Sequence, residues 1–358
     1  MTKKVLILPG DGIGQEVTKS SNEILNYLIS EHSLDFEVNT MDVGGTAYDL
    51  HGSPIPSNVL SSAKDSDAIL FGAVGGPKWD DLGWDDRPEQ ALLTLRKELG
   101  LFANLRPAFL FNELASASPI KNNIIEGLDI LIVRELTGGV YFGEPRAIVK
   151  DETPNYAFNT MIYNEDEIRR IAKIGFESAR KRNGKLCSVE KANVLEVSKF
   201  WREIVTDMSK DYPDVELTHQ LADNTAMQLV LNPNQYDVIV SSNLFGDILS
   251  DIAATLSGSI GMLPSASLNS SYQGMYVPCH GSAPDIAGQN IANPIAMIAS
   301  LAMALRYSLN EPGLADNIEN AIKVFVENGN RTKDITTSGE FIHTSDVASK
   351  LIEIMKNG

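Results

Sequence analysis

Three aspartates in the second half of the sequence have the residue type and spacing of a divalent-cation site. Asp247 and Asp251 lie four residues apart in SSNLFGDILSDIAATLSG (241–258), a helical pattern that follows an apolar run. On a helix this spacing puts both carboxylates on one face, where they repel unless a cation lies between them. Carboxylate oxygens suit Mg²⁺ or Mn²⁺, and Asp223 in LADNTAMQLV offers a third ligand. Two alternatives stay open: acids that complement a helix N-terminus and, for Asp223, an ordinary turn or N-cap.

Three arginines could bind an anionic substrate. Arg96 and Arg106 lie in LRKELGLFANLRP (95–107), and Arg134 ends the apolar run LDILIVREL (128–136). Arginine binds carboxylates through two parallel hydrogen bonds. A charge at the end of so apolar a strand lies where α/β proteins form their sites. For each arginine taken alone, a surface salt bridge is the competing interpretation.

A tyrosine and a lysine could transfer protons. Tyr141 lies in GGVYFG and Lys191 in VEKANVLE. A phenol and an amine can act as general acid and general base where their neighbours lower their pKa values. A structural tyrosine and a solvated lysine are the alternative interpretations, because the sequence does not show those neighbours.

Two glycine-containing stretches could contact a nucleotide. The loop HGSAPDIAGQNIANP (280–294) has many backbone donors, and Asp285 could accept from a ribose 2′-hydroxyl while repelling a 2′-phosphate. A plain surface loop is the alternative. The stretch LPGDGIGQEV (8–17) reads G-x-G-x-G, whereas the dinucleotide-binding fingerprint needs its third glycine where Gln15 lies. This second motif therefore favours a structural strand-to-helix turn.

Composition narrows the class of protein. The chain has 358 residues, 43% apolar and 22% charged, and a formal charge of −17 from 47 acidic and 30 basic residues. The balance is that of a globular protein and argues against nucleic acid and membrane surfaces as partners. Two cysteines give no disulfide framework or zinc site. The most apolar stretch, Pro294–Leu305, is too short to span a bilayer, and no signal peptide is visible, so we expect a cytoplasmic protein.

The elements that must position these residues follow from hydrophobic patterning. Apolar runs alternate with helical patterns such as 15–29, which predicts a largely parallel sheet buried on both faces. The polar stretch 265–274 is expected to be a loop. The segment 137–163 lacks helical periodicity and predicts a projecting hairpin that would act as a dimer arm. The predicted strands are 4–9, 36–43, 67–75, 128–136 and 236–246.

Over essentially the whole chain these stretches resemble the metal-dependent β-decarboxylating dehydrogenases of the isocitrate/isopropylmalate dehydrogenase family. The motifs that carry the resemblance are LPGDGIG, LRKELGLFANLRP, VRELTGGVYFGEPR, EKANVL, SNLFGDILSDIAA and HGSAPDIAG. The resemblance implies an α/β, two-domain, isopropylmalate dehydrogenase-like fold with largely parallel sheets, not a Rossmann fold. One domain would join 1–99 with 253–358 and hold the main cofactor-binding loop. The other, 100–252, would carry the dimer interface and the arm.

The resemblance also implies a role for each candidate residue. Arg96, Arg106 and Arg134 would bind the substrate's carboxylates, and Tyr141 would protonate the product carbon. Asp247 and Asp251 would hold Mg²⁺ or Mn²⁺ from one subunit. Lys191 and Asp223, which would also contact the substrate, would enter from the other subunit, so a homodimer would share its active sites. The residues implied for NAD are His280, Gly281, Ser282, Ala283, Asp285, Ile286 and Asn293.

The substrate is implied by the segment RPEQALLTLRKELG (87–100). Glu89, Leu92 and Leu93 match the positions that face the isopropyl group in family members that oxidise 3-isopropylmalate, and Glu89 would repel a third carboxylate. The implied reaction is oxidative decarboxylation of 3-isopropylmalate to 2-oxoisocaproate with reduction of NAD⁺, in leucine biosynthesis. The alternatives are a helix start with core leucines, a sibling enzyme for malate, tartrate or isocitrate, and a catalytically silent protein of the same fold.

Overall fold

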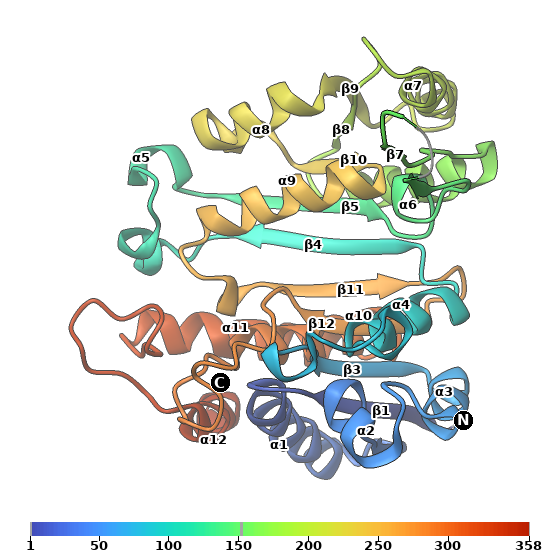
Figure 1. The fold of residues 1–358 in the computed structure, drawn as a ribbon. Coiled ribbons are helices and arrows are strands. Elements are labelled where there is room, and N and C mark those ends of the chain that lie inside the picture. The colour runs from blue at the N-terminus through green and yellow to red at the C-terminus, as the bar shows by residue number, and fades with distance from the viewer. Residues whose placement is uncertain (1, 151–152, 358) are drawn as a thin grey trace. The chain divides into compact units, whose positions relative to one another are not determined.

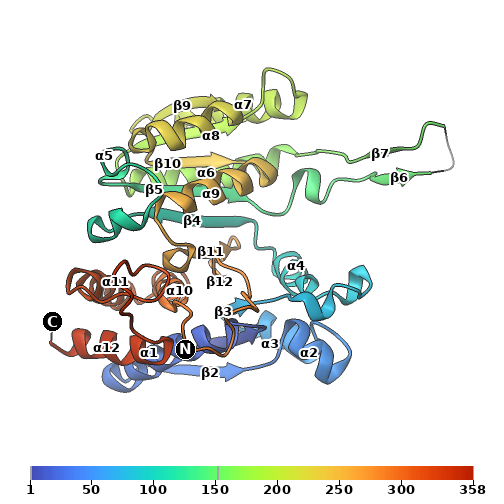
Figure 2. The same ribbon diagram turned by 60° about the vertical axis from the view of Figure 1, so that its left-hand side comes forward.

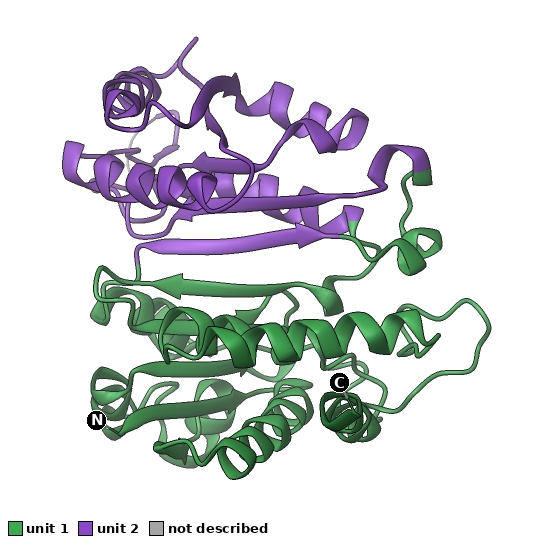
Figure 3. Cartoon of the chain, turned by 180° about the vertical axis from the view of Figure 1, so that it is seen from behind, with its two compact units in different colours: residues 1–101, 110–122, 257–358 green, residues 102–109, 123–256 purple. Residues whose placement is uncertain are grey.

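The computed structural model describes residues 2–150 and 153–357, and the chain divides into two compact units (Figures 1 and 3). Unit 1 comprises residues 1–101, 110–122 and 257–358, and unit 2 comprises residues 102–109 and 123–256. Each unit is an α/β structure with a largely parallel sheet, so the predicted fold class is confirmed.

Unit 1 holds both ends of the chain. Its helices and strands are β1 (Lys3–Gly10), α1 (Gly14–His32), β2 (Phe36–Thr40), α2 (Gly44–His51), α3 (Ser57–Asp65), β3 (Ala68–Ala73), η1 (Pro77–Trp79), η2 (Trp84–Asp86), α4 (Glu89–Glu98), η3 (Asn112–Ala117), η7 (Ile260–Met262), β11 (Pro264–Leu268), β12 (Gly274–Pro278), α10 (Ile295–Tyr307), α11 (Pro312–Glu327) and α12 (Thr344–Asn357).

The strands of unit 1 lie in the order β2-β1-β3-β12-β11, and of the strand pairs described here only β11–β12 is antiparallel. The loop prediction for 265–274 is therefore wrong for 265–268, which lie in β11, and right for 269–273, which form the turn between β11 and β12. Ser265 can be buried because the backbone satisfies its hydroxyl: Ser265 Oγ donates to the carbonyl of Val277 at 2.7 Å. A polar composition is thus compatible with a buried strand.

Helices cover both faces of the unit 1 sheet. The α10 helix is buried on every side from residue 295 to residue 305, since it contacts β3, β11 and β12 and also α1 and α11. A helix that is apolar all round belongs in such a position. The other face packs Leu6 and Phe71 against Ala63 of α3 and Leu95 of α4. No helix among the described residues is long and apolar enough to cross a membrane.

The strands of unit 2 lie in the order β4-β5-β10-β8-β9, and among these described strands only the β4–β5 pair is antiparallel. The helices α6 and α7 pack together on the sheet, and α8 and α9 form a second pair. The α5 helix (Asn122–Ile125) begins at the last residue of a unit 1 segment. The other elements of unit 2 are β4 (Ala103–Phe109), β5 (Asp129–Glu135), η4 (Gly139–Tyr141), β6 (Ala147–Val149), β7 (Tyr156–Phe158), α6 (Glu165–Arg180), β8 (Lys185–Glu190), α7 (Glu196–Met208), η5 (Ser209–Asp211), β9 (Glu216–Leu221), α8 (Ala222–Leu231), η6 (Pro233–Gln235), β10 (Val238–Ser241) and α9 (Asn243–Leu256).

The segment 137–163 contains the predicted hairpin. β6 and β7 pair antiparallel, with Ile148 opposite Ala157, and Figure 2 shows them extending away from the rest of unit 2. Residues 151 and 152 lie outside the described part of this hairpin. Ile148 is 73% exposed and Tyr156 46% exposed, so the hairpin presents apolar side chains to its surroundings.

Candidate active site

Two arginines and two aspartates of unit 2 form one charged group. Arg134 comes from β5, Arg106 from the neighbouring β4, and Asp247 and Asp251 from α9. Arg134 Nη1 donates to Asp247 Oδ1, and Arg106 Nη1 lies 3.0 Å from Asp251 Oδ1 and 3.8 Å from Asp247 Oδ1. The four-residue spacing therefore puts both carboxylates on one face of the helix, as predicted.

The alternative interpretations of these acids fit the structure poorly. The α9 helix begins at Asn243, so Asp247 and Asp251 lie beyond its first turn, where the helix dipole offers little stabilisation. Asp223 lies inside the first turn of α8, and the N-cap residue is Leu221, so the N-cap interpretation of Asp223 is wrong. The side chain of Arg134 is only 5% exposed, which excludes an ordinary surface salt bridge for this arginine.

Tyr141 joins the same group. Its hydroxyl donates to Asp247 Oδ2 at 3.0 Å, and its ring centroid lies 5.8 Å from Arg134 Cζ. Burial, together with the nearby Asp247 carboxylate, raises the pKa of Tyr141 above its usual value. The condition that its neighbours lower the pKa of Tyr141 is therefore not met. The phenol holds its proton at neutral pH, so it is a donor and not a base.

Lys191 and Asp223 form a separate pair. Lys191 follows β8 directly, and its Nζ lies 2.6 Å from Asp223 Oδ1. Hydrogen bonding to this ammonium group lowers the pKa of Asp223. The preceding residue, Glu190, is buried and accepts from Arg202 and from the backbone N–H of Ala192, which fixes the chain on both sides of Lys191.

The predicted metal ligands do not come together within one chain. Among the described residues, no three Asp, Glu, His or Cys side chains lie close enough to hold a metal ion. Asp247 and Asp251 both contact Arg106 Nη1, at 3.8 and 3.0 Å, whereas Asp223 pairs with Lys191.

The α4 helix of unit 1 carries the residues predicted to select the substrate. Glu89 is the first residue of α4 and is exposed, and Leu92 packs against the core cluster of unit 1. The core interpretation thus accounts for part of the role of Leu92. Leu93 and Arg96 are partly buried.

The glycine turn after β1 has a structural basis. A Cβ at Gly10, where φ is +72°, would lie 1.9 Å from the Ala73 carbonyl oxygen, and one at Gly12 would lie 2.1 Å from that of Ser282. The carboxylate of Asp11 accepts from the backbone N–H groups of Gly45, Thr46 and Gly75 at 2.7–2.9 Å. Close backbone approach therefore explains these glycines without a nucleotide.

The turn and the predicted cofactor loop are neighbours in unit 1. Ile13 N–H donates to the Ser282 carbonyl at 2.8 Å, and Ser282 is buried while Asp285 and Gly281 are exposed. Ala283 has a positive φ of 39°, and Ile286 is partly buried.

Two side chains of the predicted cofactor loop stand out. His280 Nε2 is buried without a hydrogen-bond partner among the described residues, and burial lowers the pKa of the imidazole. Asn293 has a structural role, since its Oδ1 accepts from the Ile295 N–H at 2.9 Å and its Nδ2 donates to Asp334 at 3.0 Å. The Asn293 side chain is therefore already held by contacts within unit 1.

Three further polar residues contact the charged group and were not foreseen. Arg106 donates from Nε to Asn104 Oδ1 at 2.9 Å and from Nη1 to Ser250 Oγ at 2.7 Å, and Asn243 binds Arg134. Strand and helix periodicity could have found them. Asn104 is two residues before Arg106, and Asn243 and Ser250 are four before and three after Asp247.

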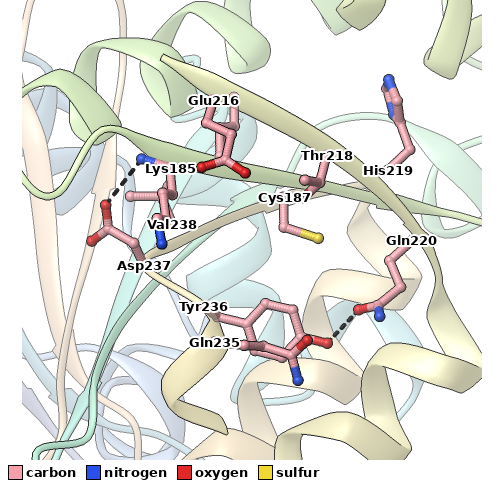
Figure 4. Close-up of a pocket in the computed structure, with 11 residues that line it drawn as sticks. Lys185, Cys187, Glu216, Thr218, His219, Gln220, Gln235, Tyr236, Asp237 and Val238 are labelled. Atoms are coloured by element: carbon pink, nitrogen blue, oxygen red, sulfur yellow. Dashed lines mark hydrogen bonds between the residues drawn. The ribbon is translucent and has the colours of Figure 1, made fainter. Parts of the chain in front are cut away.

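A cavity of about 270 Å³ lies elsewhere in unit 2, against β8, β9 and β10 (Figure 4). Its lining includes Cys187, Thr218, Gln220 and Tyr236, and the Tyr236 hydroxyl donates to Gln220 Oε1. Burial raises the pKa of Cys187 to about 11, so its thiol is unreactive at neutral pH. None of the predicted site residues lines this cavity.

Comparison with known proteins places the chain in a family of decarboxylating dehydrogenases. Residues 4–351 match the isocitrate/isopropylmalate dehydrogenase family, so the chain belongs to this family, as the motifs predict. It is 56% identical over 354 residues to the 3-isopropylmalate dehydrogenase of Hydrogenovibrio crunogenus, covering 98% of this chain and 99% of the relative. It is 54% identical over 359 residues to the enzyme of the same name from Pseudomonas savastanoi pv. phaseolicola, covering all of both chains.

A solved structure supports the same fold. The isocitrate dehydrogenase of Methylococcus capsulatus superimposes with a TM-score of 0.86 at 31% identity and covers 99% of both chains. Members named for two different substrates therefore share this architecture, and the substrate must be decided by individual side chains rather than by the fold.

Proposed function

We propose that this protein catalyses the oxidative decarboxylation of 3-isopropylmalate to 2-oxoisocaproate, coupled to reduction of NAD⁺, as a step of leucine biosynthesis in the cytoplasm. The observation that carries the proposal is the charged group of unit 2. It combines two arginine forks, two aspartates on one helix face and a protonated phenol. This set matches the needs of a 2-hydroxy diacid that loses a proton, a hydride and CO₂.

The donor set fits a divalent cation. Asp247 and Asp251 would hold Mg²⁺ or Mn²⁺ from one subunit, since both offer carboxylate oxygens and Asp251 is 71% exposed. Asp223 would be the third ligand, from the other subunit. When bound, the cation would lower the pKa of the substrate hydroxyl and stabilise the negative charge that develops on its oxygen.

The side chains of this chain have separable roles. Arg106 and Arg134 neutralise the two aspartates in the structure, and their remaining N–H groups would bind substrate carboxylates. Lys191, in its neutral amine form, would accept the proton of the hydroxyl group and become an ammonium. Tyr141, whose raised pKa keeps it protonated, would donate a proton to the product carbon.

We also propose a homodimer that shares its active sites. Four apolar side chains on the α8–α9 pair are 40–58% exposed, a surface suited to a second copy of the chain. They are Met227, Val230, Leu231 and Ile248. The exposed hairpin β6–β7 would add a second area of contact. Such a dimer would bring Lys191 and Asp223 of one chain to the Asp247–Asp251 group of the other.

Unit 1 would supply the cofactor loop and the substrate selectivity. NAD would be bound by the loop from His280 to Asn293, and the exposed Asp285 would accept from the adenosine ribose and disfavour a 2′-phosphate. On α4, Arg96 would bind a substrate carboxylate, while Glu89, Leu92 and Leu93 would favour an isopropyl group over a third carboxylate. A sibling activity on isocitrate is the second candidate, because the solved structure described above carries that name.

The test is NADH formation by the purified protein with 3-isopropylmalate, isocitrate, malate or tartrate. Each substrate is offered with Mg²⁺ and again with a chelator. We expect turnover that requires the metal and favours 3-isopropylmalate. A preference for another diacid would overturn the substrate assignment while keeping the mechanism, and no turnover with any of them would favour a catalytically silent protein.

A further inference from the structure

Buried Asn243 connects Arg134 to the turn that carries Tyr141. Asn243 Oδ1 accepts from Nε and Nη2 of Arg134 at 3.0 and 2.7 Å. Asn243 Nδ2 donates to the carbonyls of Leu136 at 3.0 Å and Gly138 at 3.2 Å. Both lone pairs and both N–H groups of the amide are thereby used, and Asn243 is only 1% exposed. A flipped amide would set N–H groups against the guanidinium, so only one orientation is allowed.

Tyr163 contacts the backbone of Asn243, and Glu135 contacts Tyr163. The Tyr163 hydroxyl accepts from the backbone N–H of Asn243 at 2.9 Å and is hydrogen-bonded to the Glu135 carboxylate. Glu135 is fully buried, accepts from the N–H of Gly138 at 2.7 Å, and pairs with Arg170 at 3.1 Å. Burial and the Glu135 carboxylate raise the pKa of Tyr163, so its hydroxyl remains a donor.

The turn itself leaves little room for movement. Gly139, the first residue of η4, has φ +76°, and a Cβ there would lie 2.6 Å from the Tyr163 hydroxyl. The N–H of Gly139 donates to the carbonyl of Ile162 at 3.0 Å. Tyr141 therefore takes its position from a turn that packs directly on Tyr163 and is held through Gly138 by Asn243.

We infer that Asn243 is a positioning residue: it aligns the Arg134 guanidinium for the substrate and holds the turn that places Tyr141 for proton transfer. The inference rests on the proposed function for the roles of Arg134 and Tyr141. Without the Asn243 amide, two N–H groups of a buried guanidinium lose their acceptor, and the carbonyls of the turn lose their donor. Hydrogen bonds to charged groups are stronger than those between neutral groups. Loss of the amide should therefore disturb the positions of both Arg134 and Tyr141.

Two substitutions separate the roles of Asn243. Asn243→Asp keeps an acceptor for Arg134 but offers no donor to the carbonyls of Leu136 and Gly138, whereas Asn243→Ala removes both. For Asn243→Ala we expect KM for 3-isopropylmalate to rise about tenfold and kcat to fall about tenfold. For Asn243→Asp we expect kcat to fall about tenfold with KM within about threefold of the wild type. A merely structural residue would not separate kcat from KM, so equal effects of the two variants, or no effect, would overturn the inference.

The matched control is Asn269→Ala in unit 1. Asn269 accepts from the backbone N–H groups of Ser271 and Gln273 and donates to the Leu99 carbonyl, so its loss also removes several internal hydrogen bonds. We expect a comparable loss of thermal stability with unchanged kcat and KM. Kinetics that change as much in this control as in Asn243→Ala would contradict a specific role of Asn243.

A measurement that needs no substrate distinguishes the two proposals. Absence of wild-type turnover would overturn the proposed function, and hydrogen exchange of the segment 138–141 would still test the positioning role. We expect faster exchange of this segment in both Asn243 variants and none of this acceleration in Asn269→Ala. Unchanged exchange in the Asn243 variants would overturn the positioning role, whatever the wild type catalyses.

Discussion

The two charged groups proposed to meet in a shared active site are built in opposite ways. Arg134 is 5% exposed at its side chain and is locked by Asp247 and Asn243. The Lys191–Asp223 pair has one ion-pair contact, and the side chain of Asp223 is 68% exposed. The first group is centred on a buried arginine with several partners, whereas the second is one ion pair whose aspartate is exposed. An exposed ion pair of this kind contributes little to the stability of the fold. Its proposed role therefore depends on the Asp247–Asp251 group of the second chain.

The largest expected effect follows removal of one charge from the first group. Asp251→Asn should lower kcat/KM at least about 100-fold and raise the Mg²⁺ concentration needed for activity, because a proposed ligand is lost. The melting temperature should stay within about 2 °C of the wild type, since Asp251 lies at the surface. Steady-state kinetics over a Mg²⁺ series and a thermal scan test both statements.

Asp316→Asn is the matched control for Asp251→Asn, because Asp316 is also an exposed helical aspartate paired with an arginine, Arg306. It should keep the activity and metal dependence of the wild type. Near-normal turnover of Asp251→Asn would contradict its assignment as a metal ligand.

Mixing subunits tests whether the two groups belong to different chains. Asp251→Asn and Lys191→Met should each be nearly inactive alone. In a shared-site dimer, random exchange of the two variants gives hybrid dimers with one intact site, so activity should recover to about a quarter of the wild type. The readout is NADH formation after the mixed proteins are dissociated and reassociated. Without recovery, each active site would have to take both groups from the same chain. The proposal of a shared active site would then be wrong.

A smaller effect is expected on α4, outside both charged groups. Glu89→Ser with Leu93→Ser should lower the ratio of kcat/KM for 3-isopropylmalate to that for isocitrate by about tenfold, because an apolar wall and a repelling charge are lost. Metal dependence should be unchanged. Leu93→Met, which keeps the wall apolar, is the control. An unaltered substrate ratio in the double variant would mean that α4 does not face the substrate.

The smallest effect concerns the strand that precedes Asp223. Burial, with Arg202 nearby, lowers the pKa of His219 in β9 from 6.5 to about 4. Between these values the unfolded chain binds the proton and the folded chain does not, so stability falls as the pH is lowered through this window. From pH 7 to pH 5 the free energy of unfolding should drop by about 1–2 kcal/mol more in the wild type than in His219→Gln. Denaturant titrations at both pH values measure this difference, and equal drops would contradict the pKa shift.

The sequence correctly predicted those elements whose structure depends mainly on local residue patterns. The apolar runs of β1, β3, β5 and β10 form strands, and the glycine turn is structural. The end of the predicted strand 236–246 is wrong, because α9 begins at Asn243 and the apolar pair Leu244–Phe245 has no period that separates strand from helix. Similarly, hydrophobicity does not predict the polar strand β11, where the hydroxyl of buried Ser265 donates to a carbonyl of the neighbouring β12.

The parts of the site that the sequence did not predict depend on contacts over long distances in the chain. Arg134 and Asn243 are 109 residues apart, and Tyr163 meets Asn243 across 80 residues. A buried glutamate such as Glu135 is unusual, but the sequence cannot show that it is buried. Charged residues near strand ends were recognisable as candidates, and helix spacing puts Asn243 on the face of Asp247. The contact of Asn243 with Arg134 and the support from Tyr163 were not visible in the sequence.

The pairing of β12 with β3 has a consequence for biosynthesis. β12 lies between β3 and β11 in unit 1, so the edge of β3 is completed only by a segment near the end of the chain. Roughly 200 residues separate the two strands, which at 5–20 residues per second amounts to about 10–40 s on the ribosome. All of unit 2 lies within that interval. Throughout it, the apolar edge of β3 is open to wrong partners, and nascent chains should therefore depend on chaperones until residue 278 has emerged.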